Sequence, residues 1–486
     1  MSTHISTFYS GHTALIADLY HLTMAYGFWK NDLSEREAVF HLFYRKPPFQ
    51  NDYVIAAGLE LVMDYLKEFK FDHEDIRYLG QLTGSDGNPL FDIGFLNYLQ
   101  RLEFSCDLDA VPEGTPIFPH QPLLRIRGPL AQATLIESGL LNLINFSSLI
   151  ATKASRIVQA AQGDRVLEFG LRRAQGFDGA LTASRAAYIG GCHATSNLLA
   201  GKWYGLPAKG THAHSWVMCF DSEMEAFEAY ADSLPNNCIL LVDTYDTIAG
   251  VRKAIRIGKE LERKGYTLNG IRLDSGDMTS LAKEARSMLD GAGLTATSIV
   301  GSDSLDEDQI LALKERGAPI DIWGVGTRLI TGQNDPALGG VYKLGALRDH
   351  HGVWEPKIKL SEESIKTSNP GILNVRRYSN AQHLPVADML YNTLTDASDE
   401  LVPFAKKQHR MALVDYDHQS LLQPILRQGK PVYTSPSLPD IRAFCAGQQA
   451  LFRSLDTTIY PHGLERTLHQ HKQQLIQEIQ TGHKSV

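Results

Sequence analysis

The chain has 486 residues, of which 43% are hydrophobic and 21% charged, as is ordinary for a soluble globular protein of two or three domains. Its 47 basic and 55 acidic residues give a formal net charge of −8 without a basic block, which argues against a nucleic acid as partner. Longer apolar runs, such as residues 238–242, are far too short to span a bilayer, so no membrane association is expected.

Two further features indicate a cytoplasmic protein. The N-terminal stretch MSTHISTFYSG has neither the basic nor the apolar segment of a signal peptide. The five cysteines are scattered and include no Cys-x-x-Cys pair, so the sequence predicts reduced thiols rather than a disulfide framework.

The N-terminal third predicts a mixture of helices and strands. Residues 13–30 carry apolar side chains at helical spacing behind Thr13, a residue that can cap a helix. Residues 38–44 predict a strand, and residues 112–129 predict short strands broken by prolines. Residues 131–161 predict a long helix that links this region to the middle of the chain.

From residue 165 onward the pattern becomes a regular alternation of strands and helices. The expected strands are short and apolar: 165–169, 238–243, 270–274, 297–302, 320–326, and one ending near Lys209. The expected helices between them are 222–234, 246–263, 278–290 and 306–316. Repeated β–α units predict a parallel sheet, either open or closed into a barrel. After about residue 345 the pattern predicts irregular β structure, and residues 462–480 predict a packing helix.

Each expected strand of the alternating region runs into polar residues. The stretches at the strand ends are GLRRAQG (with Arg172 and Arg173), GTHAHS, DTYDT, DSGD, SDSLDED and GTRLITG. In a barrel the carboxyl ends of the strands converge on one face, where active sites are built. Singly, an acid such as Asp246 or Asp306 is explained as a helix cap. Together the stretches favour a site for a large, anionic, hydroxyl-rich ligand.

Several of these residues suit phosphate chemistry. VGSD at 300–303 and GVGT at 324–327 let backbone N–H groups approach an anion, although neither matches the P-loop or the Rossmann motif. Arg172 and Arg173 can clamp a diphosphate or, equally, form surface ion pairs. Four acids can hold a phosphate-associated Mg²⁺ or bind sugar hydroxyls, namely Asp243, Asp246, Asp274 and Asp277.

These motifs resemble those of the nicotinate phosphoribosyltransferase family. The matching stretches occur in order over most of the chain: DLYHLTMAYGFW, EFGLRRAQGFDGA, KGTHAHS, LVDTYDT, IRLDSGD, WGVGT, LGGVYKL, EPKIKLSE and ADML. The resemblance implies a type II phosphoribosyltransferase fold, an irregular α/β barrel with an α/β sandwich domain formed by both chain ends. It places the N-terminal sandwich part at 1–130, the barrel at 131–345, and a C-terminal region packing on the N-terminal domain at 346–486.

The resemblance also implies a reaction. Enzymes of this family join nicotinate to 5-phosphoribosyl 1-diphosphate, giving nicotinate mononucleotide and diphosphate, as an entry step of NAD salvage. They are ATP-dependent ligases that couple ATP hydrolysis to transfer through a phosphohistidine, and Mg²⁺ accompanies the phosphates. The family motif G-T-x-A-H-S places this histidine at His214. His212 falls on the variable position, so we expect it only to pack.

The family's site residues carry over onto matching positions, and no dedicated metal-binding residue is among them. Asp243 and Asp274 are expected at the ribose. The expected 5-phosphate ligands are Gly301, Ser302, Gly324, Gly326 and Thr327. The nicotinate ring is expected between Phe169 and a Tyr20 supplied by a neighbouring subunit, with Arg172, Thr211 and Arg272 completing the substrate site. This sharing of residues implies a homodimer with shared active sites.

Three alternatives compete with this interpretation. A nicotinamide-using relative places an Asp in the region that reads GGCHATSN here, where Thr195 and Ser196 can instead donate to a carboxylate. A barrel aldolase or isomerase needs a basic group at a strand end, for which Lys209 is the candidate. A non-catalytic nucleotide sensor is expected to lack the phosphate or histidine residues, all of which are present.

Overall fold

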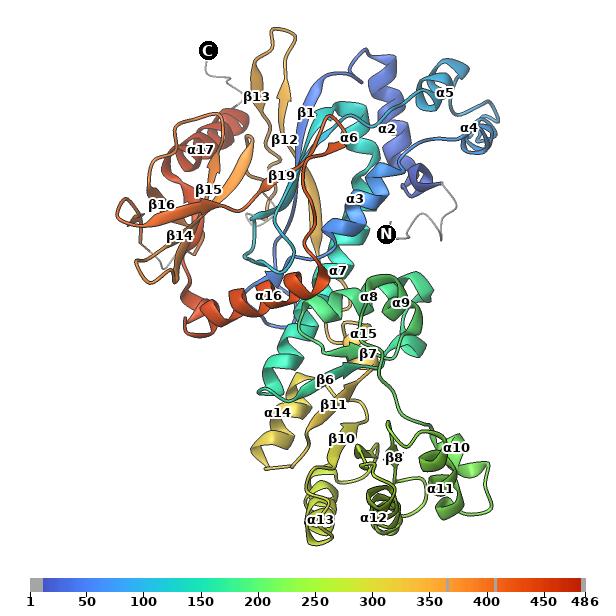
Figure 1. The fold of residues 1–486 in the computed structure, drawn as a ribbon. Helices are drawn as coiled ribbons and strands as arrows, with labels where there is room; N and C mark the ends of the chain where they lie inside the picture. Colours follow the sequence, from blue (N-terminus) through green and yellow to red (C-terminus); the bar gives the residue numbers. More distant parts are fainter. Residues whose placement is uncertain (1–11, 364–366, 406–408, 482–486) are drawn as a thin grey trace. The chain divides into compact units, whose positions relative to one another are not determined.

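A computed structural model describes residues 12–363, 367–405 and 409–481 (Figure 1). The chain forms two compact units: unit 1 contains residues 1–149 and 337–486, and unit 2 contains residues 150–336. The divisions therefore fall after residues 149 and 336, whereas the family motifs placed them after residues 130 and 345. No helix in the described residues is long and apolar enough to cross a membrane.

Unit 1 is built from both chain ends because its main sheet contains strands from both. Strand β1 (Glu37–Tyr44) pairs antiparallel with β5 (Pro122–Pro129) and with β12 (Gly340–Arg348). The same sheet contains β3 (Asp107–Ala110), β13 (Trp354–Pro356), β19 (Gln423–Arg427) and β20 (Lys430–Pro431). The second large sheet has the order β17 (Met411–Ala412), β16 (Glu400–Pro403), β21 (His462–Glu465), β15 (Pro385–Asn392), β14 (Leu373–Ser379) and β18 (Asp417–Ser420). A short pair joins β2 (Val54–Ile55) and β4 (Pro116–Ile117). The expected sandwich domain is thus present.

The helices of unit 1 correct some expectations. They are α2 (Leu19–Lys30), α3 (Leu59–Lys67), α4 (His73–Leu79), α5 (Ile93–Gln100), α6 (Leu130–Leu135), α16 (Leu438–Arg453) and α17 (Arg466–Thr481). Thr13 was wrongly expected to cap the first helix: it lies in a 3-10 turn (Thr13–Leu15), its hydroxyl donates to the Glu68 carbonyl, and α2 begins after Asp18. The stretch 462–480 begins as strand β21, since its first residues pair with β15 and β16, and only then becomes α17.

A buried ion pair ties distant parts of unit 1 together. Arg377 on β14 donates to both carboxylate oxygens of Asp388 on β15, at 2.9 and 2.7 Å, and both side chains are almost fully buried. The same carboxylate accepts from the amide of Gln121 and from the hydroxyl of Tyr460. Because every neighbour of Asp388 comes from a different segment, the pair fixes how the two chain ends meet.

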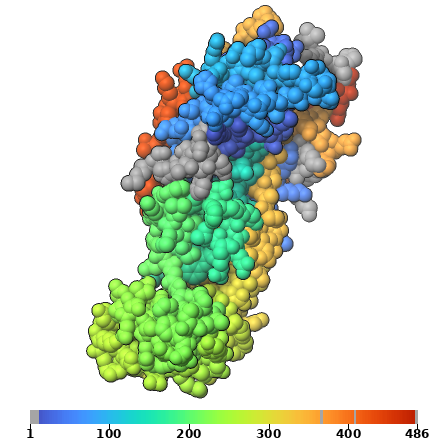
Figure 2. All heavy atoms as spheres, turned by 90° about the vertical axis from the view of Figure 1, so that its right-hand side faces the viewer, coloured from blue at the N-terminus to red at the C-terminus, as the bar shows by residue number. Residues whose placement is uncertain are grey.

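Unit 2 contains the expected parallel β–α structure. Its sheet has the order β7 (Ala194–Thr195), β6 (Arg165–Glu168), β11 (Ile322–Val325), β10 (Ser298–Ser302), β9 (Gly270–Leu273) and β8 (Ile239–Leu241). Helices α8 (Gly176–Ile189), α9 (Leu198–Tyr204), α10 (His214–Met218), α11 (Glu223–Ser233), α12 (Thr247–Arg263), α13 (Met278–Gly291), α14 (Glu307–Glu315) and α15 (Thr327–Ile330) connect the strands. The single helix expected at 131–161 is divided at Ile136 into α6 and α7 (Glu137–Ala160), and α7 leads into the sheet. In Figure 2 the atoms of the β–α region that follows α7, green to yellow-green, form a closely packed surface. The sequence singled out neither the two-residue strand β7 nor helices α8, α9, α10 and α15, and the strand expected to end near Lys209 is an isolated bridge at Ala208.

The sheet closes into an irregular barrel through a histidine. Ala208 pairs in parallel with Thr195 of β7, and the Lys209 N–H donates to the Thr195 carbonyl. On the other side of this segment, the Leu241 N–H of β8 donates to Nε2 of His212 at 3.1 Å. The imidazole must therefore be neutral, with its proton on Nδ1 beside the Ala213 carbonyl. His212 thus packs, as expected, and it also takes the place of a backbone acceptor.

Burial has a further effect on His212. The ring is only 8% exposed and meets Tyr230 edge-on at 4.7 Å. Burial, assisted by the charges of Arg272 and His214, lowers the pKa of His212 below its ordinary value. Because the unfolded chain binds this proton more readily, the stabilising effect of a neutral His212 is complete above about pH 6.5. It is lost as the pH falls through that value toward the lower pKa of the folded state.

We predict that His212→Ala lowers the free energy of unfolding by about 1–3 kcal/mol, because the buried Leu241 N–H loses its acceptor. His212→Gln, whose amide oxygen can take the place of Nε2, should lose less than half as much. Urea unfolding at pH 8 measures both values. The wild-type loss of stability between pH 7 and pH 5 should also be smaller in the Gln variant. Equal stability of the Ala variant and the wild type would contradict the closing role.

Candidate active site

One arginine connects the carboxyl ends of the strands in unit 2. Arg272 lies on β9, and its guanidinium donates through three nitrogens to three different side chains. The acceptors are the Ser302 hydroxyl at 2.8 Å, the Thr211 hydroxyl at 3.1 Å and the Asp274 carboxylate at 2.7 Å. The side chain is 14% exposed, so the charge is largely enclosed by protein and retains an open side. Residues from β9, β10 and the segment after Lys209 are thereby held at one point.

Asp274 is kept ionised by this arrangement. Burial opposes its charged form, but the hydroxyl of Ser302 and the positive charge of Arg272 outweigh burial, so the pKa of Asp274 lies below its usual value. The backbone N–H of Asp274 donates to Asp243 at 2.9 Å, and the Ser275 hydroxyl donates to the same oxygen at 2.6 Å. The two predicted acids therefore lie close together.

Asp243 retains one oxygen without a partner. Its Oδ1 atom is buried and accepts no hydrogen bond from any described residue. A buried carboxylate oxygen without a donor is costly unless a ligand completes it. Mg²⁺ in phosphate sites is held by one or two carboxylates together with phosphate oxygens, so Asp243, with Asp274 beside it, has the donor chemistry to hold one.

His214 begins helix α10 and has a possible partner for each ring nitrogen. Nδ1 lies 3.2 Å from the Thr244 hydroxyl, and Nε2 lies 3.8 Å from Oδ2 of Asp274. The side chain is 41% exposed, so a solvent-borne ligand can reach it. Thr244, which lies just after β8, is a neighbour that the sequence motifs did not single out. Its position directly after Asp243 in the DTYDT motif was the available signal.

A cleft of about 270 Å³ adjoins Arg272. The ring of Phe169 forms one wall and lies 5.9 Å from the guanidinium of Arg272. Gly324 permits this placement, because a Cβ atom there would come within 2.8 Å of the Phe169 ring. Thr211 and Ser196 also line the cleft. A flat ring bearing an anionic group matches these walls.

The two expected phosphate loops lie next to each other. Strands β10 and β11 pair in parallel, with Ser302 opposite Gly324, so both loops leave the same edge of the sheet. Asp303 and Ser304 have positive φ values of 101° and 43°, a conformation that such residues hold only where the surroundings impose it. The Ser302 hydroxyl is already engaged by Arg272 and Asp274, so backbone N–H groups remain as the donors of its loop. In the second loop, Gly326 and the exposed Thr327 lead into α15.

The remaining predicted residues fall into clear groups. Arg172 and Arg173 lie in a short 3-10 turn (Leu171–Arg173) after β6; both are exposed, and Arg172 lines the cleft. Tyr20 lies in unit 1 on α2, is 49% exposed, and donates to Glu137 at 3.3 Å. Asp246 and Asp306 are helix caps, as the simpler interpretation held: Asp246 accepts from the Ala249 N–H and Asp306 accepts from two N–H groups of α14.

The structure corrects the expectation for Thr195. Its hydroxyl does not face the cleft but donates to Glu168 at 2.6 Å, inside the barrel wall. Glu168 is 1% exposed and also accepts from the Ser184 hydroxyl and the Gly170 N–H. Of the two hydroxyl residues, only Ser196 lines the cleft. Glu168 was missed at the sequence level, because an acid inside a strand gives no signal until its neighbours from β7 and α8 are known.

Comparison with known proteins shows the family to which this chain belongs. Sequence models of the nicotinate phosphoribosyltransferase (NAPRTase) N-terminal domain, family and C-terminal domain match residues 15–145, 165–380 and 374–472. The chain belongs to the nicotinate phosphoribosyltransferase family. It is 39% identical over 481 residues to nicotinate phosphoribosyltransferase of Bacillus subtilis (strain 168), covering 96% of each chain. It is 33% identical to the human nicotinate phosphoribosyltransferase, covering 88% of this chain and 89% of the relative.

Solved structures agree with the family assignment. The crystal structure of human nicotinic acid phosphoribosyltransferase superposes with a TM-score of 0.81 at 29% identity, covering 94% of this chain and 99% of the other. A nicotinate-nucleotide pyrophosphorylase from Pyrococcus furiosus shares the fold, with a TM-score of 0.70 at 22% identity over 93% and 99% of the chains. The barrel and the sandwich domain expected from the nicotinate phosphoribosyltransferase motifs are therefore confirmed.

Proposed function

We propose that this protein joins nicotinate to 5-phosphoribosyl 1-diphosphate in the cytoplasm, as a step of NAD salvage, and that it couples this transfer to ATP hydrolysis. The observation that carries the proposal is the grouping around Arg272. The arginine borders a slot walled by Phe169 and, through Asp274, adjoins the paired carboxylates. An anionic aromatic ring, a ribose and phosphates each find a matching partner within this single group of residues.

The transfer reaction can be derived from these partners. The nicotinate ring nitrogen forms a bond to C1 of the ribose while the bond from C1 to the diphosphate oxygen breaks, and diphosphate leaves with the electron pair. Positive charge develops on the ribose, and the carboxylates of Asp243 and Asp274 stabilise it. Arg172, exposed at the cleft, is suited to the departing diphosphate. Mg²⁺ at Asp243 would neutralise further phosphate charge when bound.

ATP coupling is assigned to His214. The contact of hydrogen-bond length is between Nδ1 and the Thr244 hydroxyl, so we place the proton on Nδ1 and the nucleophilic lone pair on Nε2. Nε2 attacks the γ-phosphorus of ATP, an N–P bond forms, and ADP leaves. Water later cleaves the N–P bond and releases phosphate. Arg272 screens the carboxylate of Asp274, which otherwise repels a phosphoryl group near Nε2.

We predict that His214→Ala abolishes nicotinate-dependent ATP hydrolysis and leaves a slow, ATP-independent transfer, because only the phosphoenzyme is removed. His212→Gln serves as the neighbouring control and should keep coupling within a few-fold. Incorporation of acid-labile label from γ-labelled ATP measures the phosphoenzyme directly. Label on the His214→Ala variant equal to that on the wild type would disprove the assignment.

Tyr20 is assigned to the active site of a second copy of the chain. It lies on α2 beside two other large exposed apolar side chains, Leu19 and Met24. In unit 2, large apolar side chains are exposed close to the cleft in sequence: Leu171, Phe177, Leu198 and Leu199. Groups of exposed apolar side chains on a soluble protein indicate a contact surface. A homodimer in which the α2 surface covers this second surface would complete the ring slot with Tyr20.

Mixing inactive variants tests the shared site. Tyr20→Ala and Arg272→Ala should each be inactive, but after subunit exchange about a quarter of wild-type activity should return, since half the dimers are mixed and each has one intact site. The pair Arg272→Ala and His214→Ala is the matched control. Both residues belong to the site of one subunit, so no mixed dimer has an intact site and nicotinate-dependent ATP hydrolysis should not recover. With exchange verified by mass, absence of recovery in the first mixture would place Tyr20 outside the partner's site.

Substrate choice is assigned to Ser196. A hydroxyl lining the cleft can donate to the nicotinate carboxylate, and Arg272 supplies the opposite charge. An acid at the same place would accept from the amide of nicotinamide and repel nicotinate. The Thr195 hydroxyl is engaged by buried Glu168, which supports Ser196 rather than Thr195 for this role.

We predict that Ser196→Asp lowers kcat/KM for nicotinate about 10²-fold by like-charge repulsion, while use of nicotinamide holds steady or rises. Ser196→Asn, which has the same shape without the charge, should lose much less. Diphosphate release with each substrate, with and without ATP, gives both values. If Ser196→Asp and Ser196→Asn use nicotinate equally well, the cleft wall at this position does not determine the choice.

A further inference from the structure

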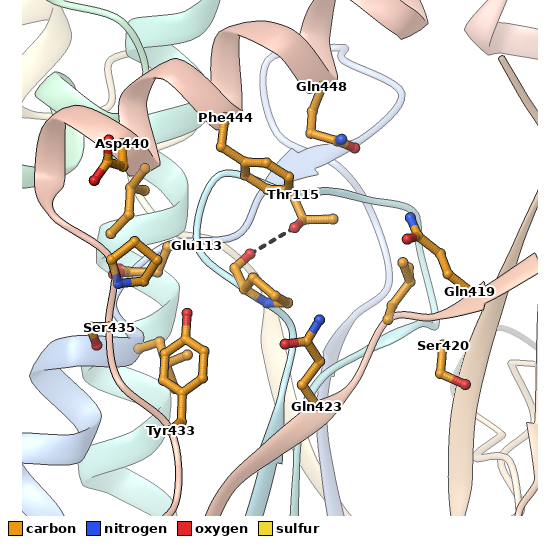
Figure 3. A pocket seen from close by; sticks show the side chains of 15 residues that line it. Glu113, Thr115, Gln419, Ser420, Gln423, Tyr433, Ser435, Asp440, Phe444 and Gln448 are labelled. Carbon is orange, nitrogen blue, oxygen red and sulfur yellow. Dashed lines mark hydrogen bonds between the residues drawn. The ribbon is translucent and has the colours of Figure 1, made fainter. Parts of the chain in front are cut away.

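Unit 1 contains a second cavity, of about 470 Å³, that the proposed reaction does not use. Helix α16 forms one wall and presents Phe444 and Gln448, while Tyr433 and Gln423 approach from the opposite side (Figure 3). The floor is apolar and includes the buried side chain of Leu421. The volume lies within the range of small-molecule sites, roughly 300–1,000 Å³.

Close backbone contacts preform this cavity. The loop that carries Glu113 and Thr115 approaches α16 at Gly114, which has a φ of +89°. A Cβ atom there would come within 3.0 Å of the Cβ of Cys445 and 3.1 Å of the Ile441 carbonyl, so only glycine allows this contact. The same loop is braced by the hydroxyl of Thr115, which donates to the Pro112 carbonyl at 2.8 Å (Figure 3).

The cavity in unit 1 and the cleft beside Arg272 differ in the charge of their lining residues. Its fifteen lining residues include two carboxylates, Glu113 and Asp440, and no Lys, Arg or His. Glu113 is 6% exposed and accepts from the Gly58 N–H at 2.5 Å, so the carboxylate is fixed at the cavity wall. Burial and the negative charge of Glu113 raise the pKa of Tyr433, in keeping with a phenol that shares this environment. Phosphates and carboxylates are disfavoured here, whereas Arg272 and Arg172 favour them in the cleft.

The polar groups at the rim have unused hydrogen-bonding capacity. Among the described residues, the side-chain amides of Gln419, Gln423 and Gln448 make no hydrogen bond, although all three line the cavity. Each amide offers two donors and an acceptor, which suits the edge of a heterocycle carrying both ring nitrogens and amino or amide groups. Two aromatic rings, of Phe444 and Tyr433, offer faces on which a flat molecule can stack.

We propose that this cavity binds a flat nitrogen heterocycle that is uncharged or positively charged, such as a pyridine carboxamide, its ring-alkylated cation, or a purine base. Stacking on Phe444 and Tyr433 supplies the apolar contact, the glutamine amides recognise the edge, and Glu113 and Asp440 select against anions. The site is independent of the proposed reaction, whose own ring slot selects an anion.

Calorimetric titration of the full-length protein tests the proposal with four probes: nicotinamide, 1-methylnicotinamide, adenine and nicotinate. Each titration is repeated with Phe444→Ala, Tyr433→Ala and, to mark binding in the cleft, Arg272→Ala. We expect a binding event for at least one of the first three probes that weakens about tenfold or more in Phe444→Ala and in Tyr433→Ala. The same event should be unchanged in Arg272→Ala. Nicotinate should bind at the cleft alone, and its binding should respond only to Arg272→Ala.

Three further variants serve as controls for the titrations. Val432→Ala removes an exposed apolar side chain next to Tyr433 that does not line the cavity, and it should bind like the wild type. Glu113→Gln should reduce the preference for 1-methylnicotinamide over nicotinamide, which a merely structural role of Glu113 does not alter. Phe444 is 43% exposed, so its replacement should leave both folding and kcat/KM for nicotinate unchanged.

Three outcomes would overturn the proposal. The first is the absence of binding by nicotinamide, 1-methylnicotinamide and adenine to any site other than the cleft. The second is affinity that is the same in Phe444→Ala and Tyr433→Ala as in the wild type. The third is nicotinate binding at the α16 cavity as tightly as nicotinamide. None of these outcomes affects the proposed transfer reaction, which is measured by diphosphate release.

Discussion

The guanidinium of Arg272 is the constraint on which the candidate active site depends. Its three donating nitrogens occupy acceptors from three separate segments, so the positions of Thr211, Ser302 and Asp274 are fixed before any substrate arrives. Hydrogen bonds to charged groups contribute about 1.5–3 kcal/mol each, more than neutral ones. The positive charge of this largely enclosed arginine also determines which charges are favoured around it. The cleft beside it favours an anionic ring, and the carboxylate beside it remains charged.

The two histidines of the GTHAHS motif show how one segment serves structure and chemistry together. His212 turns inward and accepts from β8, which closes the barrel where backbone pairing stops. His214, two residues later, begins α10 and lies within reach of Thr244 and Asp274. Because Leu241 precedes Thr244 by three residues, the closing contact of His212 and the contact of His214 use the same short stretch of β8 and its loop. A shift of the closing segment therefore moves the proposed phosphoryl acceptor as well.

Among the cavities formed by the described residues, the cleft beside Arg272 and the cavity at α16 both have aromatic walls but differ in charge. In unit 2, Phe169 lies beside Arg272, so the slot suits a carboxylate. In unit 1, Tyr433 and Phe444 lie with Glu113 in a cavity without cationic lining. Aromatic faces accept most flat molecules, and therefore the charged neighbours decide which ring each cavity prefers. Under the two proposals, one chain distinguishes an acid from its amide at two separate places.

Local patterns in the sequence determined much of the fold. The alternation of apolar strands and amphipathic helices after residue 165 located β6, β8, β9, β10 and β11, because a buried parallel strand must be apolar along its length. Motif spacing likewise placed Asp243 and Asp274 at strand ends, which in a parallel sheet meet at one edge. The sequence motifs also sufficed to show the resemblance to the nicotinate phosphoribosyltransferase family. Capping by Asp246 and Asp306 needed only their local context.

The features that the sequence did not reveal depend on contacts between distant segments. Strand β7 is too short to have a pattern, and Thr13 resembles a cap until its hydroxyl is seen to reach Glu68. Glu168 became recognisable only when β7 and α8 supplied its partners, and this contact turned Thr195 into the barrel wall and left Ser196 at the cleft. The orientation of a side chain in a short strand is set by its neighbours across the sheet, and only the tertiary structure brings those neighbours together.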